Sequence, residues 1–376
     1  MSDLPLPANP VPAPLRRSLR RKLLGWYDAH RRRLPWRDTG DPYRVLVSEF
    51  MLQQTRVAAV LPHFRRFLDR FPDLRSLAAA GDEAVCAAWS GLGYYRRARA
   101  LGAAARVLVR DHGAGIPDDL DTLRSLPGVG DYTAAALASI VHDRPAAVVD
   151  GNVLRVLARL FAVEGSISRP AGARAVGGYA RALLDPGRPG DWNQAVMELG
   201  ATVCTPRAPR CEACPWEAAC AARERNAVAA YPRRDPPKAP VSVQRALGVF
   251  RRGPRVLLVH REDPRLLDGT WEIPGLDLDP AARPLPALTA ELARRFAREV
   301  ALGGELVRIR HAITRRRFTV RAFAARAVPS LRADPGRRAW LDLESLDDYP
   351  VSSMTSKVLA ALARLGEADR RPRPRS

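Results

Sequence analysis

Four of the five cysteines in this 376-residue chain stand within seventeen consecutive positions, and any fold must accommodate them together. Cys204, Cys211, Cys214 and Cys220 follow the spacing C-x6-C-x2-C-x5-C, while Cys86 stands alone. In a reducing compartment such crowding indicates metal ligation rather than disulfides. Four thiolates hold either a tetrahedral zinc or a 4Fe-4S cluster. Zinc sites usually carry two close pairs, so one close pair with longer arms favours a 4Fe-4S cluster in a loop.

The charge of the chain favours a polyanionic partner. The formal net charge is +21 with a sequence pI near 11.0, and the only lysines are Lys22, Lys238 and Lys357, so the excess is arginine. Nucleic acid fits this balance better than a membrane, because no basic amphipathic anchor is evident. The alternative is a solvated basic surface in an arginine-rich protein. Without a long apolar run or a signal peptide, the chain is expected to be cytoplasmic and, with a DNA partner, associated with a bacterial nucleoid.

The hydrophobic period changes once along the chain, which predicts two domains. From Leu15 to about Asn226 the pattern is helical, as in "VLRVLARLF" from Val153. After the linker "AAYPRRDPPKAP", two stretches alternate as strands and helices are expected near 287–301 and 354–364. The predicted fold is therefore an all-α domain followed by an α+β domain. The predicted boundaries are a disordered arm at 1–14, a helical domain at 15–228 with a cysteine loop at 204–220, a linker at 229–240, a second domain at 241–365 and a disordered tail at 366–376.

The stretch "LPGVGDYTA" predicts a glycine-rich turn that leads directly into a helix. In a helix-hairpin-helix, such a turn brings backbone N–H groups and a helix N-terminus close to a phosphate. Gly128 and Gly130 would permit this close approach. Two glycines before a helix are also common in turns without a ligand, so this motif alone leaves both possibilities open.

Two carboxylates are candidates for acid-base chemistry. In "SEFMLQQTRV", a helix expected to start near Ser48 would give Glu49 a partly apolar environment that raises its pKa. In "VVDGNVLRVLARL", Asp150 precedes a helix with Asn152 available as the N-cap. Either residue alone is more simply part of a helix start. Together they match glycosidic-bond cleavage, in which a protonated carboxyl assists the leaving group and an ionised one faces the sugar cation.

These motifs together resemble the helix-hairpin-helix DNA glycosylases, and within them the MutY-type adenine DNA glycosylases. The resemblance extends from about Leu15 to Leu365. It rests on the segments already quoted, on the cysteine spacing, and on "LPWR", "GLGYYRRARAL" and "WNQAVMELGATVC".

The resemblance implies a role for each matching residue. Glu49 would protonate adenine, Asp150 would stabilise the sugar cation, and the "LPGVG" turn would grip DNA while the adenine is flipped out. The residues implied to line the adenine pocket are Arg32, Trp36, Arg37, Leu52 and Gln194, and those implied to fill the space left in the duplex are Gln53, Gln54 and Tyr94. Asn152 is also expected to contact the substrate or DNA. The protein is expected to act as a monomer.

Tyr132 separates two subfamilies. In the endonuclease III type, a lysine at this position attacks the sugar and the strand is then cut. Here the residue is tyrosine, and no lysine occurs between Lys22 and Lys238. The resemblance therefore implies a glycosylase that releases the base and leaves the strand unbroken, with Tyr132 positioning groups at Asp150.

The C-terminal domain resembles the Nudix-like domain of the same family, with "GTWEIPG" as its best match. Residues 275–300 contain only "REV" where a metal-binding Nudix box would need several acids, so nucleotide hydrolysis is not expected. The implied task is to read 8-oxoguanine opposite the adenine. The family typically has Phe-Ser-His in the sensing loop, whereas this chain has Ile313, Thr314 and Arg315. Thr314 keeps a hydroxyl and Arg315 supplies a cation that can meet guanine acceptors or a phosphate.

The predicted function is removal of adenine mispaired with 8-oxoguanine or guanine in base excision repair, with one 4Fe-4S cluster as cofactor and double-stranded DNA as partner. Two alternatives remain. The first is an endonuclease III-like glycosylase that also cuts the strand, and the second is a DNA-damage-binding protein without catalysis.

Overall fold

The computed structural model describes residues 11–370 except 38, 262–269, 329–330, 335–336 and 343–348. The chain packs into two compact units. Unit 1 comprises Met1–Phe64, Asp73–Ala78 and Ala103–Pro237, and unit 2 comprises Arg65–Pro72, Ala79–Gly102 and Lys238–Ser376. The two units are described separately below.

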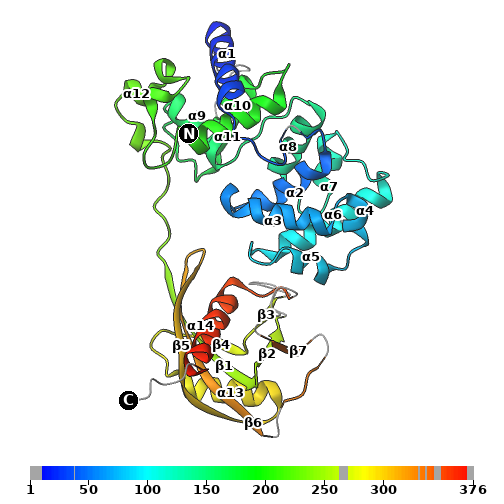
Figure 1. Ribbon diagram of the computed structural model, residues 1–376. Coiled ribbons are helices and arrows are strands. Elements are labelled where there is room, and N and C mark those ends of the chain that lie inside the picture. Colours follow the sequence, from blue (N-terminus) through cyan, green and yellow to red (C-terminus); the bar gives the residue numbers. More distant parts are fainter. Residues whose placement is uncertain are drawn as a thin grey trace. The chain divides into compact units, whose positions relative to one another are not determined.

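Helices alone form the chain up to the cysteine loop (Figure 1). Their bounds are α1 Ala13–His30, α2 Pro42–Leu52, α3 Val57–Arg70, α4 Leu74–Ala79, α5 Asp82–Ala88, α6 Tyr95–Asp111, α7 Leu120–Ser125, α8 Asp131–His142, α9 Gly151–Leu160, α10 Pro170–Leu183, α11 Pro189–Thr202 and α12 Ala221–Glu224. Short 3-10 turns at Cys211–Ala213, Glu217–Ala219 and Val228–Ala230 shape the loop region. The all-α expectation for this part is confirmed.

The predicted N-terminal arm is shorter than expected. Helix α1 begins at Ala13, and Val11 is buried in the core of unit 1, so residues 11–14 belong to the folded unit. The proline-rich composition misled the prediction, because Pro14 lies in the first turn of α1, where a missing N–H costs nothing. Residues 1–10 of the predicted arm lie outside the described residues.

The main core of unit 1 surrounds α9, whose apolar face was visible in the sequence. Val153, Val156 and Leu157 are buried against residues of α1, α10 and α11. Gly200 on α11 allows the close approach to α9, because a Cβ there would lie 2.6 Å from the Cβ of Asn152. This contact brings the C-terminal half of α11 against the start of α9.

The first residues of the predicted linker 229–240 pack onto unit 1. Tyr231 is buried beside Ala162 and Ala222, and its hydroxyl donates to Glu164 at 2.7 Å. The backbone N–H of Ile167 donates to the carbonyl of Arg233 at 2.9 Å. The contacts with unit 1 continue to Asp235, whose carboxylate accepts from Nε of Arg169 at 3.1 Å. The proline and arginine content of this segment predicted a linker and did not indicate that Tyr231 anchors it to unit 1.

Unit 2 contains a mixed β-sheet between two helices. Besides α5 and the parts of α3 and α6 that belong to this unit, its elements are β1 Val241–Arg252, β2 Arg255–His260, β3 Trp271–Glu272, β4 Gly275–Leu278, α13 Pro284–Phe296, β5 Glu299–Ile313, β6 Arg316–Val328, β7 Arg338–Asp342 and α14 Ser353–Arg370. The strand order is β3-β2-β1-β6-β5, with β4 also pairing β1 and β7 also pairing β2. The β1–β6 pair is parallel and the other pairs are antiparallel.

Each face of this sheet has its own apolar cluster. Leu288, Leu292 and Phe296 of α13 pack on one face, and Met354 and Val358 of α14 pack on the other. The helix predicted at 287–301 is found at Pro284–Phe296 instead. Ala297 takes a left-handed conformation that ends α13, and β5 begins at Glu299. Helix α14 extends to Arg370, five residues into the predicted tail. The α+β expectation for this part is confirmed.

Candidate active site

Helix α2 carries Glu49 at a position that differs from the expected one. The helix begins at Pro42, where Asp41 caps it by accepting from the N–H groups of Tyr43 and Arg44, rather than near Ser48. An Asp-Pro pair is a strong helix start, and it was overlooked. Glu49 therefore lies near the C-terminal end of α2, where the helix dipole does not favour its ionised form.

Burial makes Glu49 a weak acid suited to proton donation. The residue is 4% exposed, and its Oε2 has no hydrogen-bond partner among the described residues. Desolvation raises its pKa from 4.5 to about 7, a hydrogen bond from Tyr132 lowers it, and the nearby charge of Asp150 raises it. A carboxyl with a pKa near 7 remains partly protonated at neutral pH, as a general acid requires.

Asp150, not Asn152, is the N-cap of α9. One carboxylate oxygen of Asp150 accepts from the N–H of Val153 at 2.7 Å, and the other accepts from Nδ2 of Asn152 at 2.7 Å. Both oxygens of Asp150 are thus fixed by donors. Its position at the N-terminus of α9 favours a negative charge that could face a developing sugar cation.

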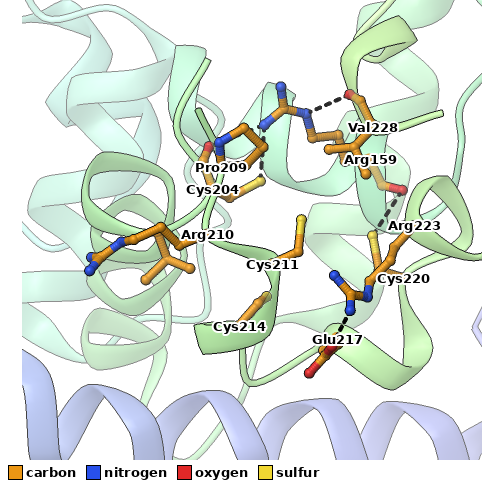
Figure 2. A pocket seen from close by; sticks show the side chains of 11 residues that line it. Arg159, Cys204, Pro209, Arg210, Cys211, Cys214, Glu217, Cys220, Arg223 and Val228 are labelled. Carbon is orange, nitrogen blue, oxygen red and sulfur yellow. Dashed lines mark hydrogen bonds and ion pairs between the residues drawn. The ribbon is translucent and has the colours of Figure 1, made fainter. Parts of the chain in front are cut away.

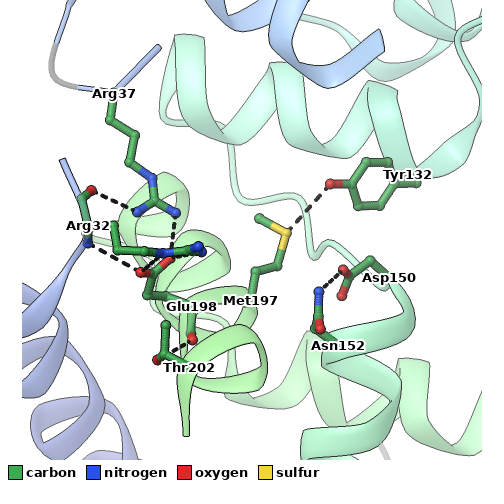
Figure 3. A network of polar contacts seen from close by, with 8 residues as sticks. All are labelled: Arg32, Arg37, Tyr132, Asp150, Asn152, Met197, Glu198 and Thr202. Atoms are coloured by element: carbon green, nitrogen blue, oxygen red, sulfur yellow. Dashed lines mark hydrogen bonds and ion pairs between the residues drawn. The ribbon is translucent and has the colours of Figure 1, made fainter. Parts of the chain in front are cut away.

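Tyr132 is the second residue of α8 and stays protonated. Burial, followed by the charges of Glu49 and Asp150, raises its pKa well above 10. Its hydroxyl also lies 3.5 Å from Sδ of Met197 (Figure 3). Tyr132 is therefore a neutral donor that hydrogen-bonds Glu49 and lines the same cavity as Asp150, and its positioning role stays a prediction.

A cavity of about 630 Å³ in unit 1 joins these groups. Its size lies within the range typical of small-molecule sites. The predicted site residues that line it are Arg32, Trp36, Arg37, Glu49, Leu52, Tyr132, Asp150, Asn152 and Gln194. Segments far apart in the sequence thus place Glu49, Asp150 and Trp36 around one cavity.

Glu198 is a lining residue that the sequence reasoning missed. Its side chain is 1% exposed, and it accepts from Arg32 Nε at 2.5 Å and from Arg37 Nη2 at 3.0 Å (Figure 3). Burial raises the pKa of Glu198, but the hydrogen bonds and charges of the two arginines outweigh it and leave the pKa lowered. One signal was available, because Glu198 follows Gln194 by one helical turn and so shares its face of α11.

Glu198 also has a geometric task. Oε1 accepts from the backbone N–H and Nε of Arg32, while Oε2 accepts from Nη2 of Arg32 and of Arg37. Four donors on two oxygens saturate the carboxylate. Glu198 therefore fixes two guanidinium groups at the wall of the cavity instead of offering its own oxygens to a ligand.

The predicted duplex-filling residues do not line this cavity. Gln53 donates from Nε2 to Thr133 at 3.3 Å. Gln54 and Tyr94 have φ angles of +56° and +54°, which are uncommon for residues other than glycine. Tyr94 is 45% exposed. Strained, exposed backbone of this kind is often retained for function, so the predicted contacts of these residues with DNA stay open.

The two glycines of "LPGVG" differ in what they require. Gly128 has a φ of +77°, a conformation that favours glycine, whereas Gly130 is extended and a Cβ there would meet no atom within 4 Å. The turn itself therefore requires glycine at position 128, whereas the open space around Gly130 is compatible with the predicted close approach of a phosphate, which stays a prediction. The bare backbone of Gly130 matters only for the approach of another molecule to the N-terminus of α8.

The four cysteines of the loop line one small pocket beside Arg159 (Figure 2). Among the described residues, no three His, Cys, Asp or Glu side chains stand close enough together to hold a single metal ion. The donor set around this shared space is all sulfur, the ligand type that both a 4Fe-4S cluster and a structural zinc use. Arg159 is 2% exposed and donates to the carbonyl of Thr205 at 2.7 Å and to Cys204 Sγ at 3.4 Å.

A chain of hydrogen bonds connects the cysteine loop with Asp150. Arg155 donates from Nη2 to Oδ1 of Asn152 at 2.9 Å and from Nε to the carbonyl of Cys204 at 2.8 Å. Asn152 in turn holds Asp150. Arg155 and Asn152 thus link the conformation of the cysteine loop to the orientation of the Asp150 carboxylate.

In unit 2, Thr314 and Arg315 form the two-residue turn between β5 and β6. Thr314 has a φ of +50°, an unusual conformation for a β-branched residue, and its hydroxyl donates to the carbonyl of Ile313 at 2.7 Å. Both side chains are exposed. The predicted reading residues therefore stand at the tip of a hairpin.

Family models match both parts of the chain. A model described as "HhH-GPD superfamily base excision DNA repair protein" matches residues 47–175, and a NUDIX domain model matches residues 245–361. The solved structure of a thermostable thymine-DNA glycosylase is 30% identical with a TM-score of 0.51, and the match covers 56% of this chain and 97% of that one. No helix in the described part of the chain is long and apolar enough to cross a membrane.

Curated relatives match at greater length. The adenine DNA glycosylase of Mus musculus is 37% identical, over 91% of this chain and 77% of the mouse protein. The protein of the same name from Homo sapiens is 36% identical, over 91% of this chain and 73% of its own length. That of Mycolicibacterium smegmatis is 47% identical, over 52% of this chain and 66% of its own length.

Proposed function

Because the chain belongs to the adenine DNA glycosylases, enzymes of base excision repair, we propose that its substrate is adenine opposite 8-oxoguanine or guanine and that Glu49 is the general acid. The observation that carries this assignment is the raised pKa of Glu49, about 7, in the same cavity as Asp150. A proton delivered to the adenine ring would make the base a better leaving group.

Asp150 would act on the sugar side of the reaction. Breaking the N-glycosidic bond leaves positive charge on the deoxyribose, and a nearby carboxylate stabilises that charge. Val153 and Asn152 hold the carboxylate of Asp150 in one orientation before the reaction. Such preorganisation lowers the barrier because no group has to reorient as the charge develops.

The cavity wall would recognise the flipped base. Trp36 offers an aromatic surface for stacking, and its ring packs edge to face on Phe64 with 5.0 Å between the ring centroids. Arg32 and Arg37, fixed by Glu198, present N–H donors, and Gln194 has both a donor and an acceptor. Adenine has ring-nitrogen acceptors and one amino donor, so this set suits its edges.

Tyr132 supports a reaction that stops at base release. Its position follows the hairpin turn where a strand-cutting relative would need a lysine, and a phenol has no amine nitrogen with which to form a Schiff base. The same turn, with Gly128 and Gly130, would hold the DNA backbone. The expected product is an abasic site in an unbroken strand.

A 4Fe-4S cluster would be held by Cys204, Cys211, Cys214 and Cys220. When bound, it would supply a rigid crosslink for the loop. Arg155 and Arg159, which bond to Cys204, would transmit that order to α9. No step of base removal needs to pass through the cluster.

The hairpin tip of unit 2 would read the base opposite adenine. Thr314 offers a hydroxyl and Arg315 a cation, and both are exposed at a turn where a base edge can reach them. An enzyme that acts on chromosomal DNA would work at the nucleoid. The protein's predicted cytoplasmic, nucleoid-associated location and monomeric state stay predictions.

Product analysis tests this function directly. A duplex with one adenine opposite 8-oxoguanine, guanine or thymine is incubated with the protein, and free adenine and strand breaks are measured separately. We expect adenine release opposite 8-oxoguanine and guanine, with strand breaks only after alkali. Nicking without alkali, or borohydride trapping of a protein–DNA adduct through an amine, would instead identify a strand-cutting glycosylase.

A further inference from the structure

An exposed face of the sheet in unit 2 gathers two arginines and two hydroxyls next to the hairpin tip. Register fixes which residues share this face, because directly paired residues of neighbouring strands point the same way. Arg310 of β5 pairs with Thr319 of β6, and Ala312 pairs with Arg317. Arg310 and Arg317 are therefore diagonal neighbours on one face, with Thr319 between them.

Strand β1 adds to the same face through its parallel pairing with β6. Ser242 pairs with Arg317, and Gln244 pairs with Thr319. Ser242 and Thr319 are exposed, whereas Gln244 is buried and donates to the carbonyl of Ala282 at 2.9 Å. The face is thus open from the hairpin tip down to Gln244, where a loop closes it.

The opposite face of these strands packs against the core, so Arg310 and Arg317 must lie on the exposed face. Ile309, Phe318 and Val320 pack in the cluster that α14 covers. Reversing the face would bury Arg310 and Arg317 under α14. On the exposed side, α13 covers the far end of the sheet, around Val300 and Phe323, and leaves the hairpin end uncovered.

Arg310 and Arg317 have no carboxylate partner among the described residues. The nearby acids are committed elsewhere. Glu305 accepts from Arg308 at 2.6 Å and from Arg321 at 2.8 Å. Asp277 pairs with Arg245 at 2.6 Å. Arg317 donates to the carbonyl of Thr314 at 3.1 Å, which directs its guanidinium toward the turn.

Arginines on one exposed face without a carboxylate partner are suited to bind an anion, and hydroxyls on the same face add neutral donors. We propose that Arg310, Arg317, Thr319 and Ser242 form a binding site for a DNA backbone phosphate beside the base that the hairpin reads. This inference rests on the proposed reading role of Thr314 and Arg315. The site would fix the register of the hairpin on the strand and would itself carry no sequence information.

The salt dependence of DNA binding tests the site. The full chain is titrated with a duplex that has 8-oxoguanine, or guanine, opposite a tetrahydrofuran abasic analogue, so there is no adenine to release. Each phosphate contact contributes about 0.9 to the slope of log K against log salt concentration. We expect Arg310→Gln and Arg317→Gln each to lower this slope by about 0.9 and to weaken binding of both duplexes by the same factor.

Arg308→Gln is the matched control, because Arg308 lies on the same strand and face but is already paired with Glu305. It is expected to leave the slope within about 0.3 of the unmodified protein, well below one phosphate contact. Thr319→Val is expected to weaken binding several-fold without changing the slope, since it removes a donor and no charge.

The proposal is overturned if the Arg310/Arg317 double variant keeps the original slope, or if Arg308→Gln lowers the slope as much as the other two. It is also overturned if the variants weaken only the 8-oxoguanine duplex, because a phosphate contact cannot distinguish the two bases. Since this duplex holds no substrate adenine, the result does not depend on the acid role of Glu49. Adenine release measures that role separately.

Discussion

Nδ2 of Asn152 lies 2.7 Å from Oδ2 of Asp150, and the two residues are held together at the start of α9. Asn152 itself is fixed from the other side by Arg155. The orientation of the carboxylate proposed to face the sugar cation therefore depends on a neutral side chain that itself lines the cavity.

Asn152→Ala is expected to slow adenine release with little effect on DNA affinity. A hydrogen bond to a charged group contributes about 1.5–3 kcal/mol, which corresponds to a rate loss of about tenfold to a hundredfold. Single-turnover adenine release at saturating protein gives the rate, and a titration with uncleavable duplex gives the affinity. A rate equal to that of the unmodified protein would show that Val153 alone is enough to hold Asp150.

Glu49→Gln is expected to stabilise the folded protein at alkaline pH. Below the unfolded pKa of 4.5, the carboxyl is protonated in both states; as pH rises toward the folded value of about 7, only the unfolded state loses its proton, so stability falls. Above pH 7 the penalty reaches about 3 kcal/mol, from 1.36 kcal/mol per unit of pKa shift. Denaturant unfolding at pH 4 and pH 8 should show a gain for the variant only at pH 8.

Glu198→Gln is the matched comparison in the same cavity, with the opposite sign. Its lowered pKa means that the ionised form contributes stability above the unfolded pKa, and this contribution is lost as pH falls through the folded pKa. Loss of the buried charge leaves Arg37 without its carboxylate and should cost about 3 kcal/mol at pH 8. Equal behaviour of the two variants would contradict the environments described here.

Iron analysis tests the cofactor. The purified protein should contain about four iron atoms and four sulfides per chain and absorb at roughly 400 nm. Substituting Cys214 with serine should lower the iron content and destabilise the loop that Arg159 holds. One zinc per chain without iron would reject the cluster.

Arg315→His tests how the opposite base is read. Arg315 is expected to favour 8-oxoguanine or guanine through their acceptors, and each good side-chain–base contact discriminates by about 1–3 kcal/mol. The measurement is the ratio of adenine release rates opposite 8-oxoguanine and opposite guanine, before and after the substitution. An unchanged ratio would remove Arg315 from recognition.

The sequence predicted which residues meet in the active cavity better than it predicted their local geometry. Motifs identified Glu49, Asp150 and Tyr132, and the fold brings all three to one cavity. The start of α2 was missed although the Asp41-Pro42 pair signals it, and the N-cap of α9 was assigned to Asn152 although Asp150 supplies it; helix boundaries are the part of a fold that a sequence pattern fixes least. The buried environment of Glu49 follows from tertiary packing.

Glu198 and the exposed sheet face with Arg310 and Arg317 show why other parts of the proposed sites could not be predicted from the sequence. The partners of Glu198, Arg32 and Arg37, lie more than 160 positions away in the sequence. Likewise, the alternation in "RRRFTVRAF" predicts a strand, but only its register with β1 and β5 places Arg317 next to Arg310. Long-range pairing of this kind has no local signal.

The pH dependence of single-turnover adenine release from a duplex with adenine opposite 8-oxoguanine tests the central claim most directly. If Glu49 donates the proton, the rate should fall about tenfold per pH unit above its pKa of about 7, and Glu49→Gln should lower the rate at pH 7 by about 10²–10⁴-fold and abolish this inflection. A rate independent of pH through this range, or adenine release by Glu49→Gln within a few-fold of the unmodified protein, would contradict the assignment.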